Sequence, residues 1–267
     1  MDKQYFERHN RRDFHNDRRN DEQRTDDFVF GTRAVIEAIR FGKQIDKILI
    51  KLGQNNELSN ELFDLIREND IPVQRVPQEK LDRITRKNHQ GVIALMSPIA
   101  FCKVEDVVAQ VFEKGQMPFI IALDGVTDVR NFGAIVRTAE CAGVHAIVVP
   151  EKGSSRIGAD AVKTSAGALH KVPICRTSSL KKTLQDLMAS GLTVCGATEK
   201  TDGNYFQHNL TGPLCIVMGA EDEGLSPEVF RICQPLLKIP ILGEIESLNV
   251  SVAASVLMYE VVRQRMA

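Results

Sequence analysis

Polar side chains suited to chemistry stand where apolar runs of the chain end. The loop from Asp124 to Gly133 follows one such run and opens a predicted helix, with Asn131 as its expected N-cap. Arg137 lies six residues further on, and an arginine near a helix start can clamp a phosphate through two parallel hydrogen bonds. Taken alone, this stretch favours the simpler alternative of a surface ion pair between Arg137 and Glu140, one helical turn apart.

Two more polar stretches lie near the end of the chain. A Gly-rich acidic turn containing Glu221 follows the apolar run Leu214–Met218, and a polar hinge containing Ser247 and Asn249 leads into a long apolar helix. Ligands of open α/β sheets bind outside the carboxyl ends of the strands, so both stretches are candidate binding loops. Tight-turn glycines beside a solvated acidic face are the structural alternative.

The elements that must position these side chains alternate regularly from Phe119 onward. Continuous apolar runs, each typical of a buried strand, are separated by segments with helical periodicity. The expected strands are Phe119–Leu123, His145–Pro150, Val172–Cys175, Leu192–Ala197 and Leu214–Met218. This pattern predicts the α/β class, with a parallel sheet covered by helices on both faces.

Composition divides the chain into four predicted parts. Residues 1–27 carry seven lysines and arginines and eight acidic residues with few apolar ones, so we expect a disordered charged tail. Residues 28–98 form a small α/β domain with eleven basic against nine acidic residues. Residues 99–117 are an expected linker, and residues 118–267 form the larger α/β domain. The basic segment Lys80–Gln90 favours either a substrate-presenting surface or an ordinary solvated face.

The overall composition narrows the classes of function. A net charge of −1 excludes a global basic footprint, so any nucleic acid would bind a local patch. The six cysteines form no C-x-x-C pair, which argues against a zinc site and a disulfide framework and predicts small buried hydrophobes in a reducing compartment. No apolar stretch approaches the ~20 residues of a membrane span, and the charged N-terminus does not resemble a secretory signal. We therefore expect a cytoplasmic protein with no metal and no membrane partner.

Two familiar phosphate-binding patterns are missing. No G-x-G-x-x-G follows the first strand of the larger domain, which disfavours a Rossmann dinucleotide site. The run from Gly158 to Thr164 is similar to a P-loop but has no glycine before Lys163, which disfavours nucleotide hydrolysis.

Three motifs in order carry a family resemblance. They are N-x-G-A-x-x-R-T-A-x-x-A-G at 131–143, M-G-A-E-x-x-G-L at 218–225, and I-P-I-x-G-x-x-x-S-L-N-V-S-x-A-A at 239–254. Together they resemble the SpoU, or TrmH-like, family of RNA ribose 2′-O-methyltransferases. The small N-terminal domain makes the chain most similar to the bacterial members that methylate guanosine in 23S ribosomal RNA.

The resemblance implies more about the fold than the periodicity does. It implies a SPOUT-like parallel-sheet domain whose C-terminal segment forms a trefoil knot, although chains in general do not thread through loops. It also implies that the small domain is ribosomal protein L30e-like and binds the RNA substrate. Members of the family form homodimers through the final helix, Leu248 to Met266, so a homodimer is expected here.

The same resemblance implies a cofactor and a site. S-adenosylmethionine would be held largely by backbone groups, at the positions Gly219, Ile239, Leu248, Thr198 and Glu199. The catalytic region would contain Arg137, surrounded by Asn131, Glu221, Ser247 and Asn249. A guanidinium is a poor base, so Arg137 suits a clamp for phosphate and ribose unless a neighbour draws off its proton, and Glu221 is the rival proton acceptor.

The implied partner is 23S ribosomal RNA or its large-subunit precursor. RNA would contact the basic segment from Lys80 to His89 together with Arg130, Arg137 and Arg156. Aromatic residues make up only 6% of the chain, so shape and phosphate contacts are expected to dominate over base stacking. A transfer RNA ribose 2′-O-methyltransferase is the alternative within the class, and a non-catalytic RNA-binding ribosome-assembly factor is the alternative outside it.

Overall fold

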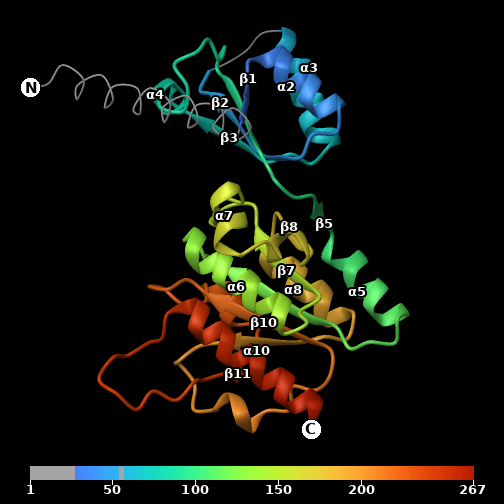
Figure 1. Cartoon of the computed structure of the whole chain (residues 1–267), viewed down its shortest axis with the longest axis vertical. Coiled ribbons are helices and arrows are strands. Elements are labelled where there is room, and N and C mark those ends of the chain that lie inside the picture. The colour runs from blue at the N-terminus through green and yellow to red at the C-terminus, as the bar shows by residue number, and fades with distance from the viewer. Residues whose placement is uncertain (1–27, 54–56) are drawn as a thin grey trace, which may run out of the picture. The chain divides into compact units, whose positions relative to one another are not determined.

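The computed structural model describes residues 28–53 and 57–267, which form two compact units that divide between Pro98 and Ile99 (Figure 1). Each unit contains its own sheet and its own hydrophobic core. The predicted disordered tail, residues 1–27, lies outside the described residues. Among the residues described, no helix combines the length and apolar character that crossing a membrane requires.

The first unit is a four-stranded mixed sheet in the order β1-β4-β2-β3. Strand β2 pairs parallel with β3 and antiparallel with β4, and β1 closes the other edge antiparallel to β4. Helices α2 and α3 pack together, and Leu81 of α4 belongs to a separate small core with Leu49 of β2. The elements are β1 (Phe28–Phe30), α2 (Thr32–Arg40), β2 (Ile45–Lys51), α3 (Glu57–Glu68), β3 (Val73–Val76), α4 (Gln78–Asp82) and β4 (Val92–Met96).

The second unit alternates strands and helices as the periodicity predicts. Its elements are β5 (Phe101–Cys102), α5 (Val104–Glu113), β6 (Phe119–Asp124), α6 (Val129–Cys141), β7 (Ala146–Pro150), α7 (Ala159–Thr164), the 3₁₀ turn η1 (Ala168–His170), β8 (Ile174–Thr177), α8 (Leu180–Ala189), β9 (Thr193–Ala197), the 3₁₀ turn η2 (Tyr205–Gln207), β10 (Leu214–Gly219), α9 (Pro227–Phe230), β11 (Leu236–Leu237) and α10 (Val250–Met266). All paired strands in its sheet run parallel, in the order β11-β9-β10-β6-β7-β8-β5.

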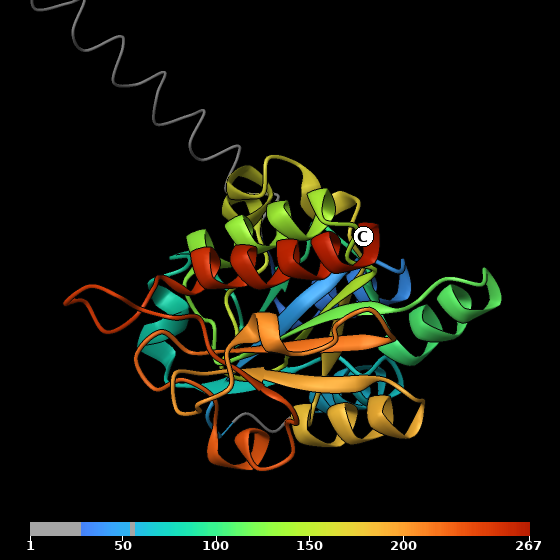
Figure 2. The same cartoon turned by 90° about the horizontal axis from the view of Figure 1, so that it is seen from below.

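Helices cover both faces of this parallel sheet, which confirms the predicted α/β class. Alternate strand residues point to opposite faces, so Ile121 belongs to one core and Ile120 to the other. Helices α6, α7 and α10 pack on the first face, where α6 and α10 lie side by side (Figure 2). Helices α5, α8 and α9 cover the second face.

The expected linker, residues 99–117, is part of the second unit. Phe101 and Cys102 form β5, which pairs with β8 at the edge of the large sheet. Val104 and Val108 of α5 are buried in the core of the second face. The short amphipathic pattern at these positions is therefore that of an edge strand and a covering helix. The two units divide at Pro98, the residue at which the predicted small domain ends.

Cysteines are buried at four of six positions. Desolvation by burial raises the pKa of the Cys175, Cys195 and Cys233 thiols to about 12 each, and it raises the pKa of Cys215 well above the usual value of a thiol. These four behave as the expected small hydrophobes. The expectation is wrong for Cys102 and Cys141, whose residues are exposed because they lie on the edge strand β5 and at the end of α6.

Candidate active site

Two neighbouring strands, β6 and β10, end together on the carboxyl edge of the large sheet. Their register places Gly219 opposite Asp124, the last residue of each strand. The Asp124 Oδ2 atom accepts a hydrogen bond of 2.7 Å from the backbone N–H of Ser226, which joins the end of β6 to the segment that follows the acidic turn. The strand order reverses at this pair, because β7 lies beyond β6 and β9 beyond β10. Ligands of open α/β sheets bind at such a switch point.

The acidic turn after β10 is closed by two backbone hydrogen bonds. Ala220 and Gly224 exchange N–H to carbonyl bonds of 3.0 and 2.9 Å, and Gly224 has the left-handed φ of 72° that glycine adopts freely. A Cβ atom on Gly219 would overlap the backbone of Gly224 and Leu225, so the turn folds back directly over the end of the strand. The glycines thus shape the turn that presents Glu221.

Helix α6 begins at Val129, and its N-cap is Asp128 rather than the predicted Asn131. The Asp128 Oδ1 atom accepts hydrogen bonds from the backbone N–H groups of Arg130 (2.8 Å) and Asn131 (2.9 Å). The Asp128 carboxylate therefore already occupies the N-terminus of α6. The sequence had suggested that this helix end was free to bind an anion. The side chain of Asn131, one turn into the helix, is consequently available for other contacts.

Asn131, Glu221 and Asn249 form one hydrogen-bonded cluster. The Asn131 Nδ2 atom donates to Glu221 Oε2 at 3.0 Å, and Asn249 Nδ2 donates both to Glu221 Oε1 at 3.1 Å and to Asn131 Oδ1 at 3.0 Å. The three residues come from α6, the acidic turn and the hinge before α10. The sequence motifs that contain them thus meet in space, and we refer to them as the amide–carboxylate cluster.

Asn249 also begins the last helix. As the N-cap of α10, its Oδ1 atom accepts hydrogen bonds from the Ser251 backbone N–H (3.0 Å) and from the Ser251 hydroxyl (2.6 Å). Its amide nitrogen faces the cluster while its amide oxygen caps the helix. One side chain therefore couples the start of α10 to the acidic turn and to α6.

Arg137 and Ser247 stand outside this cluster. Arg137 is exposed, about 9 Å further along the α6 axis than Asn131, and it makes no hydrogen bond or ion pair with any described residue. The alternative of an Arg137–Glu140 ion pair is wrong, since Glu140 pairs with Lys171 at 3.1 Å. Ser247 is exposed two residues before Asn249, and its side chain makes no hydrogen bond within the described part of the chain.

The positions expected to border the cofactor follow three adjacent strands. Gly219 ends β10, Thr198 and Glu199 follow β9, and Ile239 comes two residues after β11. These parallel strands are neighbours in the sheet, so all four residues lie along its carboxyl edge. Leu248 is 39% exposed and directly precedes Asn249 of the cluster.

The segment from Ile239 to Leu248 has backbone N–H groups that are unpaired in the described part of the chain. It follows β11, which contains only Leu236 and Leu237. Within the described residues, no backbone N–H from Ile241 to Leu248 donates a hydrogen bond to another backbone group. Free backbone donors in the segment that links the end of β11 to Asn249 fit a polar ligand that is recognised mainly through the main chain.

The sequence did not predict the roles of two structural residues of the site, Asp128 and Gly133. Asp128 could have been recognised, since aspartate is among the preferred N-cap residues. The role of Gly133 could not, because it depends on a distant residue: a Cβ there would overlap Thr164 of α7, whose hydroxyl reaches the Val129 carbonyl at 3.3 Å. The described residues contain no group of three or more metal-ligating side chains suited to a metal ion.

Comparison with known families assigns both units. Residues 118–259 match the model of the SpoU rRNA Methylase family, and residues 28–101 match the model described as RNA 2′-O ribose methyltransferase substrate binding. The first match contains the whole amide–carboxylate cluster. The second covers all described residues of the first unit.

Known proteins with similar chains agree with these matches. A protein of Staphylococcus aureus strain MSSA476 assigned to the TrmH family of tRNA/rRNA methyltransferases is 38% identical over 90% of this chain and 97% of its own. A Bacillus subtilis strain 168 protein with the same assignment is 33% identical over 90% and 96%. The crystal structure of the SpoU methyltransferase AviRb from Streptomyces viridochromogenes, in complex with AdoMet, has a TM-score of 0.57 at 23% identity over 90% of each chain. At this level of identity, the similarity to AviRb shows only that the two proteins share a fold.

The two roles of Asn249 predict different consequences for two substitutions. Asn249→Ala removes the cap and the cluster contacts, and we expect the free energy of unfolding to fall by about 1–2 kcal/mol. Asn249→Asp keeps an oxygen for the Ser251 N–H but places a carboxylate against Glu221, so its destabilisation should shrink in 1 M salt. Denaturant unfolding at low and high salt measures both. An Asp variant as stable as the wild type at low salt would contradict the cluster.

Proposed function

Because the chain belongs to the SpoU rRNA methylase family, we propose that it transfers a methyl group from S-adenosylmethionine to a ribose 2′-hydroxyl of RNA. The proposed target is a guanosine of 23S ribosomal RNA. The observation that carries the proposal is the amide–carboxylate cluster, in which the three family motifs meet at the switch point of the sheet. Transfer RNA is the other substrate class that the names of the relatives include.

S-adenosylmethionine supplies a methyl group activated by a positively charged sulfur. The residues proposed to hold it are Gly219, Thr198, Glu199, Ile239 and Leu248, along the carboxyl edge of β9, β10 and β11. The free backbone N–H groups from Ile241 to Leu248 support this assignment, because the cofactor offers amino-acid and ribose oxygens as acceptors. Gly219 lets the acidic turn fold back over the end of β10, next to the proposed cofactor positions.

Arg137 is proposed to position the RNA. It is the one arginine of the three motifs, and it is exposed and unpaired within the described residues, so its guanidinium is free to take a phosphate in two parallel hydrogen bonds. Placing the 2′-hydroxyl oxygen in line with the methyl group supplies a large part of the acceleration. Asn131, Ser247 and Asn249 complete the polar surroundings of the reacting hydroxyl.

The proton of the 2′-hydroxyl has two proposed acceptors, Arg137 and Glu221. The contacts of Glu221 favour a holding role, since both of its oxygens already accept amide hydrogen bonds that fix the turn. A carboxylate has about four lone-pair positions, so Glu221 can still accept a further hydrogen bond from the ribose. Arg137 would act as a base only after losing a proton, and no described residue stands ready to remove it.

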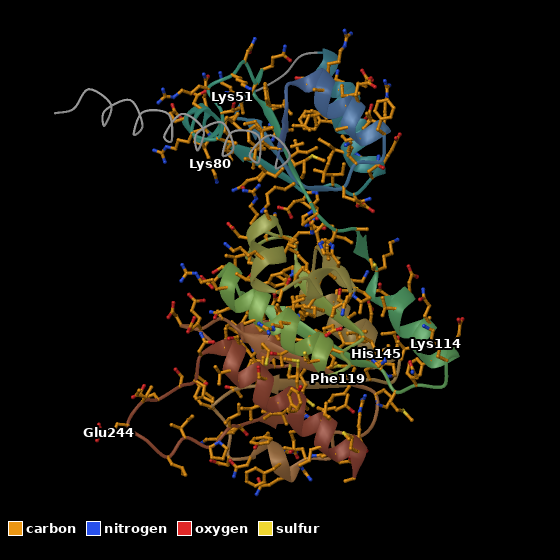
Figure 3. The ribbon with its side chains drawn as sticks, viewed as in Figure 1. Lys51, Lys80, Lys114, Phe119, His145 and Glu244 are labelled. Atoms are coloured by element: carbon orange, nitrogen blue, oxygen red, sulfur yellow. The ribbon has the colours of Figure 1, made fainter. Side chains whose placement is uncertain are left out.

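The RNA-binding face of the first unit is proposed to be the segment from Lys80 to His89. Four exposed cations stand on it, Lys80, Arg83, Arg86 and Lys87, and none forms an ion pair with a described residue. On helices α2 and α3 two arginines are paired instead, Arg40 with Glu61 at 2.7 Å and Arg67 with Asp64 at 3.7 Å. Lys80 and Lys51 are marked on this unit in Figure 3. Unpaired cations release more counterions on meeting phosphate, so this face has the stronger electrostatic attraction for RNA.

Its loop is held rigid by His89. The buried imidazole accepts the Gly91 N–H at Nδ1 (3.0 Å) and donates from Nε2 to Asp82 (2.9 Å). The next residue, Gln90, accepts the Thr32 N–H at the start of α2. The cations between Lys80 and His89 therefore project from a fixed loop, which lowers the entropy cost of binding.

A homodimer through α10 is the proposed assembly. Val252, Tyr259 and Met266 recur every seven residues on this helix and are 48%, 50% and 82% exposed. An apolar stripe on an exposed helix face is typical of a surface that pairs with a partner helix. The proposed trefoil knot involves the same region: β11 lies outside β9, and the chain then returns to pack α10 against α6.

Methyl transfer tests the proposed activity directly. With labelled S-adenosylmethionine and bacterial RNA lacking the modification, the wild type should label large-subunit ribosomal RNA at a ribose 2′-oxygen. Arg137→Ala should lower kcat/KM by about 10²–10³-fold while leaving cofactor binding unchanged, because the guanidinium that it removes holds the RNA. Labelling of purified transfer RNA alone would move the target to that class. RNA binding without any transfer would overturn the activity and favour the assembly-factor alternative.

The charged face predicts a salt-dependent binding difference. Changing Lys80, Arg83, Arg86 and Lys87 to Gln should weaken RNA binding at least about tenfold. It should also reduce the slope of log K against log salt by roughly 0.7–0.9 for each phosphate that the variant no longer neutralises. The control changes the paired Arg40 and Arg67 of α2 and α3 to Gln, and because it removes two charges rather than four, the losses of affinity are compared per charge removed. Equal losses of affinity per charge for both sets would contradict the assignment of the RNA face.

Sedimentation tests the apolar stripe. We expect the wild type to be a dimer at micromolar concentration, and Val252→Glu combined with Tyr259→Glu to be a folded monomer, because two carboxylates cannot be buried against a partner helix. Ser190→Glu, on an exposed position after α8, is the control and should stay dimeric. A wild-type monomer at micromolar concentration would refute the proposed homodimer.

A further inference from the structure

A cavity of about 530 Å³ lies on the second unit, away from the candidate active site. It opens between α5 and the starts of two strands, with His145 immediately before β7 and Pro173 immediately before β8. Because the strands are parallel, their starts lie on the edge of the sheet opposite to the one that carries the amide–carboxylate cluster. Nothing in the proposed methyl transfer uses this cavity.

His145 is locked in one orientation and one tautomer. Its backbone N–H donates to the Phe119 carbonyl at 2.8 Å, and its Nδ1 atom accepts the Phe119 N–H at 3.0 Å. A ring nitrogen that accepts carries no proton, so the neutral imidazole presents its N–H at Nε2. Burial lowers the pKa of His145, and the cations of Arg265 and Lys114 lower it further, which keeps the ring neutral at pH 7.

The donors around His145 lack acceptors. Neither its Nε2–H nor the side chains of Gln110 and Lys114, which line the cavity on the same stripe of α5, form a hydrogen bond within the described residues. Figure 3 shows Lys114, His145 and Phe119 gathered at the end of α5. Arg265 adds positive charge nearby, while its Nη1 and Nη2 atoms donate to the carbonyls of Met117, Pro118 and Gly212.

Along α5, Asp106 and Lys114 of the lining lie at opposite ends of the cavity, with apolar residues between them. Val107 and Val111 provide apolar surface in the middle of the cavity. Asp106, the acidic residue of the lining, lies two turns of helix before Lys114, beside Lys103 and Cys102. The end near His145 therefore offers hydrogen-bond donors and positive charge together, and the middle offers an apolar wall.

We propose that this cavity binds a small organic oxyanion, a carboxylate or phosphate group attached to an apolar body. The His145 Nε2–H and the Lys114 ammonium hold the anionic oxygens, with the Gln110 amide as a further donor. The apolar body lies against Val107 and Val111. A cleft with an apolar wall and a few convergent polar groups is the usual form of a small-molecule site.

The binding test uses the full chain and three probes of one shape: benzoate, phenyl phosphate and the uncharged benzamide. Ligand-observed NMR and calorimetry should give dissociation constants of about 1 mM for at least one anion, with benzamide at least about tenfold weaker. The tighter of the two anions identifies the natural group as carboxylate or phosphate. Anions that bind no better than benzamide would overturn the proposal.

Matched variants place the binding in this cavity. His145→Asn keeps an oxygen at the δ position for the Phe119 N–H and removes the Nε2–H, and Lys114→Met removes the charge at similar length. Each should weaken anion binding at least about fivefold, whereas Lys182→Met on α8, outside the cavity, should stay within twofold of the wild type. Lys114 is exposed, so its substitution leaves the core intact. Wild-type affinity in Lys114→Met would therefore refute the site even where His145→Asn unfolds.

Discussion

The hydrogen bonds among Asn131, Glu221 and Asn249 tie together chain segments that are 90 and 118 residues apart. Each amide has one nitrogen and one oxygen to offer, and the cluster uses both kinds of atom. Asn249 donates into the cluster and accepts from the first turn of α10, so the last helix cannot shift without moving the acidic turn. The carboxyl edge of the sheet depends on this link, because it joins the start of α6, the turn after β10 and the hinge before α10.

Close backbone approach is the second constraint on the same edge. Gly219 admits the returning turn, and Gly133 admits Thr164 of α7 against α6. Both glycines are required by what packs on them and not by an unusual φ, since neither has a left-handed conformation. A glycine of this kind fixes the distance between two elements, and that distance decides whether the amide and carboxylate side chains reach each other.

Local patterns predicted the elements well where burial determines them. The strands of the large sheet are apolar on both faces, and their positions, the parallel class and the helices between them followed from that alone. The motifs also located the loops that meet. Two kinds of error remained. The N-cap was a local misassignment, because α6 begins at Val129 and Asp128 caps it, which leaves Asn131 inside the first turn and free to contact Glu221. The other errors arose where a choice depends on a distant partner. The segment 99–117 has the composition of a linker, and only its pairing with β8 makes it part of the core.

Arg137 has no partner among the described residues, whereas its neighbours on α6 do. Its neighbours on α6 are engaged: Thr138 contacts Ser255 of α10 at 3.2 Å, Glu140 pairs with Lys171, and Asn131 belongs to the cluster. Those contacts hold α6 in place and leave Arg137 without a competing acceptor among the described residues. A guanidinium kept free of internal ion pairs incurs no cost for breaking one when a phosphate arrives. Arg137 therefore projects, without a partner in the described part of the chain, from a helix whose contacts with α10 and Lys171 hold it in place.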